Sequence, residues 1–270
     1  MKAIPLLLIL ILTAAVTMAQ YDTNNSEKTR GFPWPEGKRC AVSLTFDDAR
    51  LSQIDKGIPL LNRYGIKATF YISPKGLLQR LEGWQQAAAA GHEIGNHTMT
   101  HPCTGNYAFS RDNALEDYSL EKIAGEINQA NELIHNRLGV QVRSFAYPCG
   151  QTFVGRGREL KSYIPLVAKK FLCGRGWLGE DSNDPWICDL SQLQGMESDG
   201  KSFEELKGLV DKAAPTGKWL ILAGHEMDDS GFQTTRLSSL ELLCRYVLDP
   251  ANGIWTAPVG QIADYIKRHR

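Results

Sequence analysis

The chain has 270 residues, with 30 acidic and 30 basic side chains and a formal net charge of zero at pH 7. This balance does not indicate a nucleic-acid or membrane-surface partner, since both require a marked basic excess. The roughly 250 residues that follow the first twenty are enough for one large domain with a substantial core.

Residues 1–19 have the features of a signal peptide. Lys2 supplies a positive charge, an almost unbroken apolar run covers 4–16, and Thr17 and Ala19 are small residues near the expected cleavage point. The run is short for a membrane span, and no second long apolar run follows it. We therefore expect a periplasmic or extracellular protein with no membrane span after cleavage. An uncleaved N-terminal anchor is the alternative.

Residues 20–37 are polar and contain Gly and Pro, so we expect a flexible leader. Through residues 38–270, short apolar segments alternate with segments of helical periodicity. The predicted strands cover 40–46, 67–73, 92–95, 144–147, 170–173, 218–223 and 253–255. The predicted helices cover 54–64, 77–90, 120–138, 158–169, 203–213, 237–247 and 259–266. The alternation predicts parallel β/α units, and the absence of a linker predicts a single domain.

Residues with reactive side chains follow several of these strands, at 47–48, 97–101, 148–150 and 225. In a β/α barrel the carboxyl ends of the strands share one face, where active sites gather. We therefore expect these residues to lie close together.

Two histidines and two aspartates can form a metal site with a base beside it. His97 and His101 stand four residues apart, so a helical or turn-like segment puts both rings on one side. Asp47 and Asp48 are neighbours at a strand end, so one can bind a metal while the other accepts a proton. His225 can then serve as a general acid. Taken singly, each residue could be an ordinary surface or core side chain.

Six cysteines are present, and none forms a C-x-x-C pair. Cys103 and Cys149 both lie beside candidate site residues. They can meet as a disulfide, remain free thiols or join the metal ligands, and we favour the disulfide in an exported protein.

Four segments resemble, in order, successive motifs of the polysaccharide deacetylases (carbohydrate esterase family four, the NodB-homology domain). They are Thr45–Asp48 (TFDD), residues 91–102 (GHEIGNHTMTHP), Phe145–Gly150 (FAYPCG) and Leu222–His225 (LAGH). The resemblance spans roughly residues 38–268. It implies a distorted (β/α) barrel with seven or eight strands.

The resemblance also implies a function. It is that of a metal-dependent hydrolase removing acetyl groups from an N- or O-acetylated polysaccharide or oligosaccharide, with water activated by the metal and Asp47. The implied metal ligands are Asp48, His97 and His101, and the implied ion is Zn²⁺, with Co²⁺ or Ni²⁺ as alternatives. His225 would be the general acid.

The third motif implies a further set of contacts. The backbone N–H of Cys149 would stabilise the oxyanion, with Pro148 and Tyr147 beside it. Here the motif departs from the family pattern, because Ala146 stands at the place of an arginine and Cys149 at the place of an aromatic residue. Arg143 or Arg175 is the candidate to replace the arginine.

The family's Asp-Trp motif has only loose counterparts here, at Asp184 to Trp186 and at Asp189. Two other functions remain open on the sequence alone: an amidohydrolase acting on a small C–N substrate, and a non-catalytic glycan-binding protein in which the metal is a structural staple. A binding protein has no need of Asp47 as a base, which favours the enzyme. The sequence does not indicate an oligomeric state.

Overall fold

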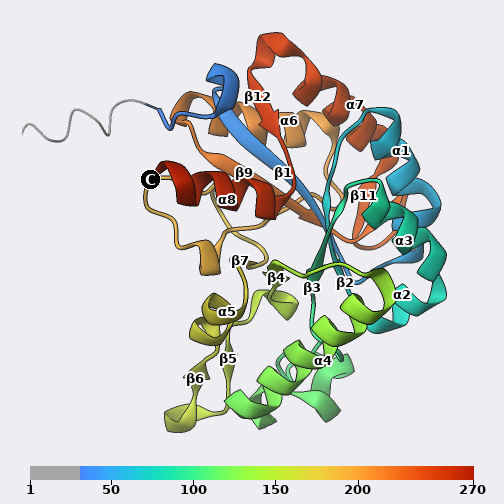
Figure 1. The fold of residues 1–270 in the computed structure, drawn as a ribbon, viewed down its shortest axis with the longest axis vertical. Helices are drawn as coiled ribbons and strands as arrows, with labels where there is room; N and C mark the ends of the chain where they lie inside the picture. The colour runs from blue at the N-terminus through green and yellow to red at the C-terminus, as the bar shows by residue number, and fades with distance from the viewer. Residues whose placement is uncertain (1–30) are drawn as a thin grey trace, which may run out of the picture. The chain divides into compact units, whose positions relative to one another are not determined.

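In the computed structural model residues 31–270 are described, and the predicted signal peptide lies outside them. The chain from Phe32 to Arg270 forms one compact unit around a parallel sheet (Figure 1). Seven strands follow the order β7-β4-β3-β2-β1-β9-β8, and an eighth, β12, also pairs with β1. These strands are β1 (Cys40–Asp47), β2 (Thr69–Ile72), β3 (Glu93–Asn96), β4 (Ser144–Ala146), β7 (Cys173–Arg175), β8 (Met196–Glu197), β9 (Trp219–Gly224) and β12 (Ile254–Thr256).

All pairings within this sheet are parallel, which confirms the predicted β/α units and the distorted barrel. A single parallel bridge between Arg175 and Leu193 links β7 to the segment before β8, at the opposite edge of the sheet order. The barrel is therefore closed by one residue pair there, where a regular barrel would have a full strand ladder.

β1 is the central strand of the domain. All eight of its residues are buried, and it has β2, β9 and β12 as partners. A strand covered on both faces must be apolar almost throughout, which is why the run from Cys40 to Phe46 is readily recognised in the sequence. The burial of β1 fixes the position of Asp47, its last residue.

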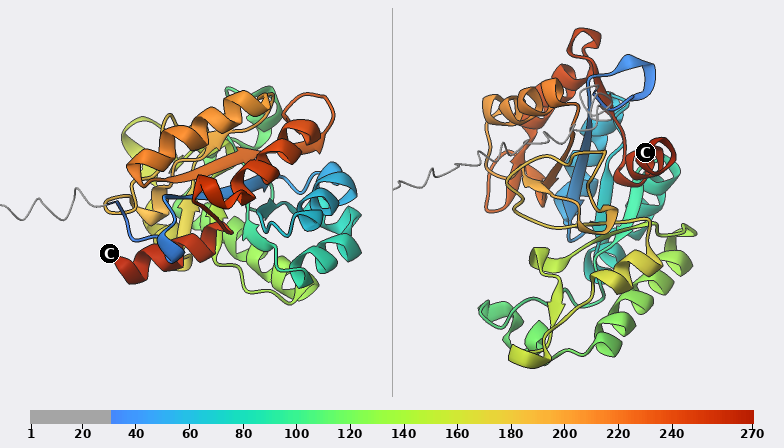
Figure 2. Two further views of the ribbon diagram at one scale, coloured as in Figure 1. Left: turned by 90° about the horizontal axis from the view of Figure 1, so that it is seen from above. Right: turned by 90° about the vertical axis from the view of Figure 1, so that its left-hand side faces the viewer.

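The view from above in Figure 2 shows helices on both sides of the strands. Within residues 31–270 there are eight α-helices. They are α1 (Ile58–Arg63), α2 (Pro74–Gln79), α3 (Leu81–Ala89), α4 (Leu120–Leu138), α5 (Ile164–Lys170), α6 (Phe203–Ala213), α7 (Leu237–Leu248) and α8 (Val259–His269). The longest, α4, begins after Ser119, whose side chain accepts a hydrogen bond from the Lys122 N–H, and ends at Gly139 with φ 68°. Both are the expected start and stop signals of a helix.

Several short elements differ from the sequence prediction. The predicted strand 170–173 begins later, because α5 continues through Lys170. The predicted helix 77–90 is two helices, which meet at Arg80 with φ −135°. The strand β8 was not predicted, nor were the pairs β5 (Phe153–Val154) with β6 (Lys161–Ser162) and β10 (Glu226–Asp228) with β11 (Thr234–Arg236). Strands of two or three residues are too short for a periodic signal.

The predicted leader is wrong for its last residues. Phe32 and Trp34 are buried, and the Trp34 indole N–H donates a hydrogen bond to the Gly217 carbonyl (2.9 Å). The Phe32 ring contacts Trp186 edge-on at 4.9 Å between ring centroids. The aromatic side chains of this segment bury enough apolar area to pack on the domain, despite its polar composition.

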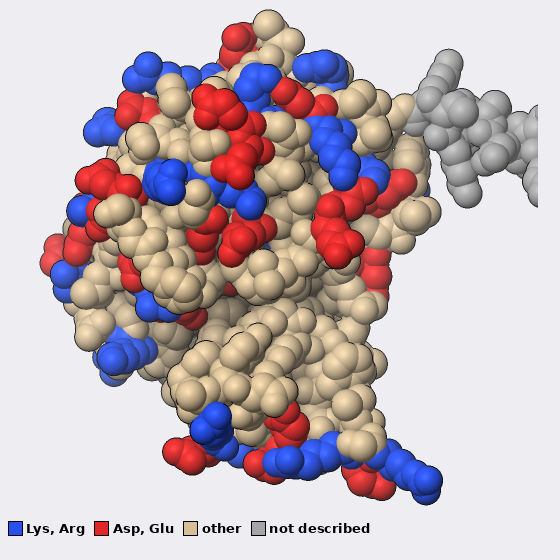
Figure 3. Space-filling model, turned by 180° about the vertical axis from the view of Figure 1, so that it is seen from behind, with Lys and Arg blue, Asp and Glu red and all other residues tan. Residues whose placement is uncertain are grey.

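Among the described residues, no helix has both the length and the apolar character needed to cross a membrane. On the face drawn in Figure 3, acidic and basic side chains are interspersed over the upper part, and a broad area with few charges lies below them. This face therefore has no extended patch of a single charge.

Candidate active site

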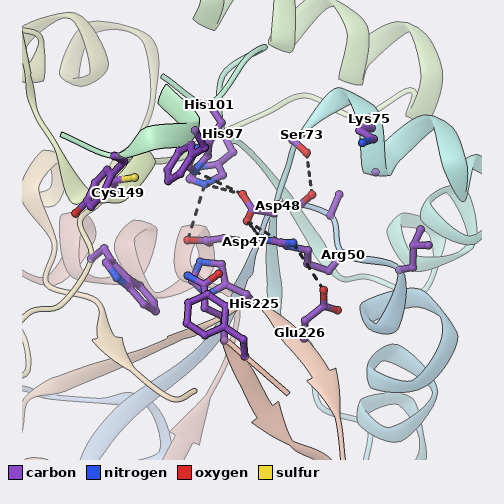
Figure 4. Close-up of a pocket in the computed structure, with 18 of the residues that line it drawn as sticks. Asp47, Asp48, Arg50, Ser73, Lys75, His97, His101, Cys149, His225 and Glu226 are labelled. Carbon is purple, nitrogen blue, oxygen red and sulfur yellow. Dashed lines mark hydrogen bonds and ion pairs between the residues drawn. The ribbon is translucent and has the colours of Figure 1, made fainter. Parts of the chain in front are cut away.

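The candidate residues lie where the strands of the barrel end (Figure 4). Asp47 ends β1, His97 follows β3, Cys149 follows β4, and His225 follows β9. Six predicted site residues line one cavity of about 850 Å³: Asp47, Asp48, His97, His101, Cys149 and His225. The structure thus brings together residues that are up to 178 positions apart in the sequence.

Asp48, His97 and His101 fit a metal ion. The Asp48 Oδ1 atom lies 3.5 Å from His97 Nε2 and 3.6 Å from His101 Nε2, and the three ligand atoms lie within 4.8 Å of one another. Ligands at about 2.1 Å from a tetrahedral ion lie roughly 3.4 Å apart, so these atoms can surround one ion with little movement. Two imidazoles and a carboxylate suit zinc or a similar divalent metal.

The protonation states of these ligands suit metal binding. Burial alone would raise the pKa of Asp48, but the charges of His97, His101, His225 and Arg50 outweigh it and lower the pKa to about 2. Burial, reinforced by the charge of His97, lowers the pKa of His101 to about 4. At neutral pH, Asp48 is therefore ionised and His101 is neutral, as a metal requires of its ligands.

Arg175, one of the two arginines expected to replace the missing motif arginine, contacts Asp47. The Nη2 atom of Arg175 donates a hydrogen bond to Asp47 Oδ1, and both side chains are buried. The Arg175 guanidinium also lies 4.8 Å from the ring centroid of Tyr71. Arg143, the other candidate, is half exposed and pairs with Asp264 instead. The cation beside Asp47 therefore comes from β7, the next strand of the sheet after β4.

The buried partner of His225 is Asp199, which the sequence analysis missed. Asp199 Oδ2 lies 2.7 Å from His225 Nδ1, and its Oδ1 accepts a hydrogen bond from the Thr235 hydroxyl (2.9 Å). Asp184 and Asp189, the predicted candidates, instead accept hydrogen bonds from nearby backbone N–H groups. Asp199 follows the two-residue strand β8, so no strand signal marked it in the sequence.

His225 remains protonated to higher pH than an ordinary histidine. Burial of the ring lowers its pKa, but the hydrogen bond to Asp199 and the charges of Asp47 and Asp48 outweigh burial and raise it. A histidine that acts as a general acid must be protonated at the working pH. The carboxylates around His225 keep its ring protonated at pH values closer to neutral.

We expect Asp199→Asn to lower the alkaline limit of activity. Loss of the carboxylate lowers the pKa of His225, so the protonated form is lost at lower pH, and the alkaline limb of a kcat–pH profile should move toward acid. The maximal kcat should fall about 10- to 100-fold as well. Asp189→Asn, which alters the exposed cap of a short 3-10 helix, is the control and should leave the profile in place. An Asp199→Asn profile identical to that of the unaltered protein would contradict the pairing.

The third-motif segment supplies one residue to the cavity. Cys149 lines it and forms a disulfide with Cys103, as favoured from the sequence. Tyr147 is 1% exposed, and its hydroxyl donates a hydrogen bond to the Ser191 carbonyl (2.8 Å), so its side chain packs in the core. Pro148 is also buried, and neither residue lines the cavity. The predicted substrate contacts of Tyr147 and Pro148 are therefore not supported.

The backbone around the cavity is in an unusual conformation. Eight described residues other than glycine have positive φ, and six of them line this cavity: Asp48, Ala49, His101, Cys149, Leu178 and Gln233. Each costs of order 1 kcal/mol and requires support from its surroundings. Tight turns immediately after the strands allow ligands from separate strands to converge here.

Fold and site together define a β/α-barrel protein with a candidate His-His-Asp metal site and a buried pair of His225 with Asp199. The family model described as polysaccharide deacetylase matches residues 35–161, which include the first three motifs. The chain belongs to the polysaccharide deacetylases, a family of carbohydrate deacetylases that are hydrolases.

The chain matches only part of the length of the curated relatives. A gellan lyase from Bacillus sp is 30% identical over 216 residues, which is 73% of this chain and 8% of that protein. Chitin deacetylase 1 from Cryptococcus neoformans var. grubii is 26% identical over 175 residues, which is 64% of this chain and 34% of that protein. The matched region is thus about a third or less of either relative.

Solved structures share the fold over most of both chains. A candidate polysaccharide deacetylase from Mycobacterium smegmatis has a TM-score of 0.65 at 16% identity, covering 88% of this chain and 93% of that one. A family 4 acetyl xylan esterase from Clostridium thermocellum, solved with a cobalt ion, has a TM-score of 0.55 at 18% identity, covering 85% and 93%. At these identities the likeness shows the fold alone.

Proposed function

We propose that the protein is a metal-dependent hydrolase that removes acetyl groups from an N- or O-acetylated carbohydrate outside the cytoplasm. The observation that carries the proposal is the convergence of Asp48, His97 and His101 with two separately supported groups, Asp47 and His225. A glycan-binding protein in which the metal is only structural would need neither the contact of Arg175 with Asp47 nor the contact of Asp199 with His225. Zn²⁺ is the ion we propose, with Co²⁺ or Ni²⁺ as alternatives.

The protein groups divide the proton transfers between them. A divalent ion held by Asp48, His97 and His101 would lower the pKa of water and polarise a carbonyl. Asp47, fixed by Arg175, is the base that takes a proton from water. His225, fixed by Asp199, is on the opposite side of Asp47 from His97 and His101 in Figure 4, and donates a proton to the leaving amine or alkoxide. The Cys149 backbone N–H is the donor for the oxyanion.

The entrance of the cavity favours a saccharide over a small polar C–N substrate. Phe109 is 72% and Phe232 88% exposed, and both line the cavity. The rings of Tyr107 and Phe109 stack at 5.5 Å between centroids, with an angle of 4° between their planes. Exposed aromatic faces at a site entrance suit the apolar faces of sugar rings. Trp177 contacts His225 edge-on at 4.8 Å, so it supports the acid.

We expect Phe109→Ala to weaken the binding of long substrates only. The KM for an acetylated oligosaccharide should rise about 5- to 30-fold, because a stacking contact is worth about 1–2 kcal/mol. Turnover of a small alkyl acetate, which has no ring to stack on Phe109, should be unchanged. Phe153→Ala removes a half-exposed ring outside the cavity and is the control. An unchanged KM for oligosaccharides would contradict a role for Phe109.

The direct test is acetate release by the mature protein from a panel of N- and O-acetylated saccharides, with and without chelator and with added Zn²⁺ or Co²⁺. Chelator-sensitive release would support the proposal, and the responding substrate would distinguish amide from ester. Saccharide binding without release by the metal-loaded protein would favour the glycan-binding function. Release of ammonia or an amine from small amides alone would favour the small-substrate amidohydrolase.

A further inference from the structure

The Cys103–Cys149 disulfide joins a fixed segment to the wall of the cavity. Cys103 is fully buried, its N–H donates a hydrogen bond to the Ser110 hydroxyl (2.8 Å), and its carbonyl accepts one from the Leu115 N–H (2.9 Å). Cys149 lines the cavity in the turn after β4. The crosslink therefore ties the cavity end of this turn to an anchored residue.

The same disulfide contacts a metal ligand. The Cys103 Sγ atom lies 3.7 Å from His101 Nδ1. A disulfide sulfur carries no hydrogen, so a hydrogen bond across this contact is donated by Nδ1, and that tautomer leaves the Nε2 lone pair free. Nε2 is the atom that faces Asp48. His97 is arranged in the same way, because its Nδ1 lies 2.9 Å from the Ala146 carbonyl oxygen, which also can only accept.

The conformation of Cys149 also depends on support. Its φ is 53°, in the left-handed region that residues with side chains rarely adopt. Gly150, at φ 68°, lies so close to Trp177 that an added Cβ would meet the Trp177 backbone nitrogen at 2.8 Å. Because Cys149 lines the cavity, a small rotation of this turn changes the direction of its N–H. The link to Cys103 restricts that rotation.

We propose that the Cys103–Cys149 disulfide is a positioning element of the active site, which sets the tautomer of His101 and the direction of the Cys149 N–H together. This inference rests on the proposed function for its second part only. Reduction breaks the S–S bond and adds two electrons and two protons, one hydrogen to each sulfur, while a phosphine reductant takes up an oxygen atom from water. The Cys103 thiol can then donate to Nδ1, which allows the hydrogen of His101 to move to Nε2 and block the metal position.

The test measures Zn²⁺ affinity, by competition with a chromophoric chelator, beside kcat and KM. It compares the oxidised protein, the protein reduced with a phosphine, and Cys103→Ala/Cys149→Ala. We expect reduction and the double alanine variant to weaken Zn²⁺ binding about 10-fold or more, the usual cost of losing the partner of a metal-bound histidine. We expect kcat to fall about 10-fold or more, with KM changed less than about threefold. The double alanine variant should not respond to the reductant.

A second variant separates the two effects. In Cys149→Ala with the Cys103 sulfur methylated, that sulfur carries no hydrogen, so it can only accept from His101 Nδ1, and no crosslink forms. Zn²⁺ affinity should return toward that of the oxidised protein, while kcat stays low. Cys188→Ala removes a free, half-buried cysteine outside the cavity and should keep the full response to reductant.

Mass spectrometry after alkylation establishes that the bond is open, and circular dichroism establishes that the protein is folded. The proposal would be overturned if the reduced protein, shown to be folded and to have both cysteines open to alkylation, kept its Zn²⁺ affinity and its kcat within about twofold of the oxidised values. If no form releases acetate, the proposed function fails, and the Zn²⁺ measurement still decides whether the disulfide positions His101.

Discussion

Asp47→Asn should reduce kcat by about 10³-fold or more while the protein still binds one metal ion. The substitution removes the proton acceptor but keeps the size of the side chain, and the remaining Oδ1 can still accept a hydrogen bond from Arg175. General-base catalysis contributes about 10²–10⁴-fold, which sets the scale of the loss. The measurement is acetate release under saturating substrate, with metal content determined on the same sample.

The control for this experiment is Asp55→Asn. Asp55 is exposed and pairs with Arg80, so the same chemical change there should leave kcat within about twofold. Undiminished turnover by Asp47→Asn would remove Asp47 from the mechanism. Loss of the metal together with activity would instead make Asp47 a metal ligand, and the assignment of base and ligand between Asp47 and Asp48 would be wrong.

The sequence indicated the candidate metal ligands and the central strands because both have strong local signals. The run from Cys40 to Phe46 is apolar since β1 is covered on both faces, and the four-residue spacing of His97 and His101 is visible without a structure. Both features depend on residues that are close in the chain, which is where periodicity and spacing are informative.

The residues that contact Asp47 and His225 from behind could not be predicted, because they come from short strands that are distant in the sequence. Arg175 reaches Asp47 across 128 positions and Asp199 reaches His225 across 26, and each ends or follows a strand of two or three residues. No residue spacing shows which of several arginines or aspartates will face a given partner. For the arginine beside Asp47, the sequence left two candidates, Arg143 and Arg175. For the aspartate beside His225, the loose sequence candidates were other aspartates than Asp199.

Arg175→Met should destabilise the protein by about 3–5 kcal/mol, the usual cost of removing one partner of a buried ion pair. Arg175 is 0% exposed, so water cannot replace its hydrogen bond to Asp47, and the carboxylate is left unpaired in the core. Activity should fall as well, because Arg175 is the charged side chain that donates a hydrogen bond to Asp47 and so fixes its direction. The measurement is urea unfolding, with kcat determined on the protein that remains folded.

Arg143→Met is the control, since Arg143 is the other arginine that could have filled this role and its pair with Asp264 is half exposed. Arg143→Met should lower the free energy of unfolding by at most about 1 kcal/mol. The double variant Arg175→Met/Asp47→Asn separates charge from packing. If the unpaired carboxylate causes the loss, the double variant should be more stable than Arg175→Met alone. If the two losses simply add, the cost lies in the packing of the arginine against Tyr71, and Arg175 supports the core more than it orients the base.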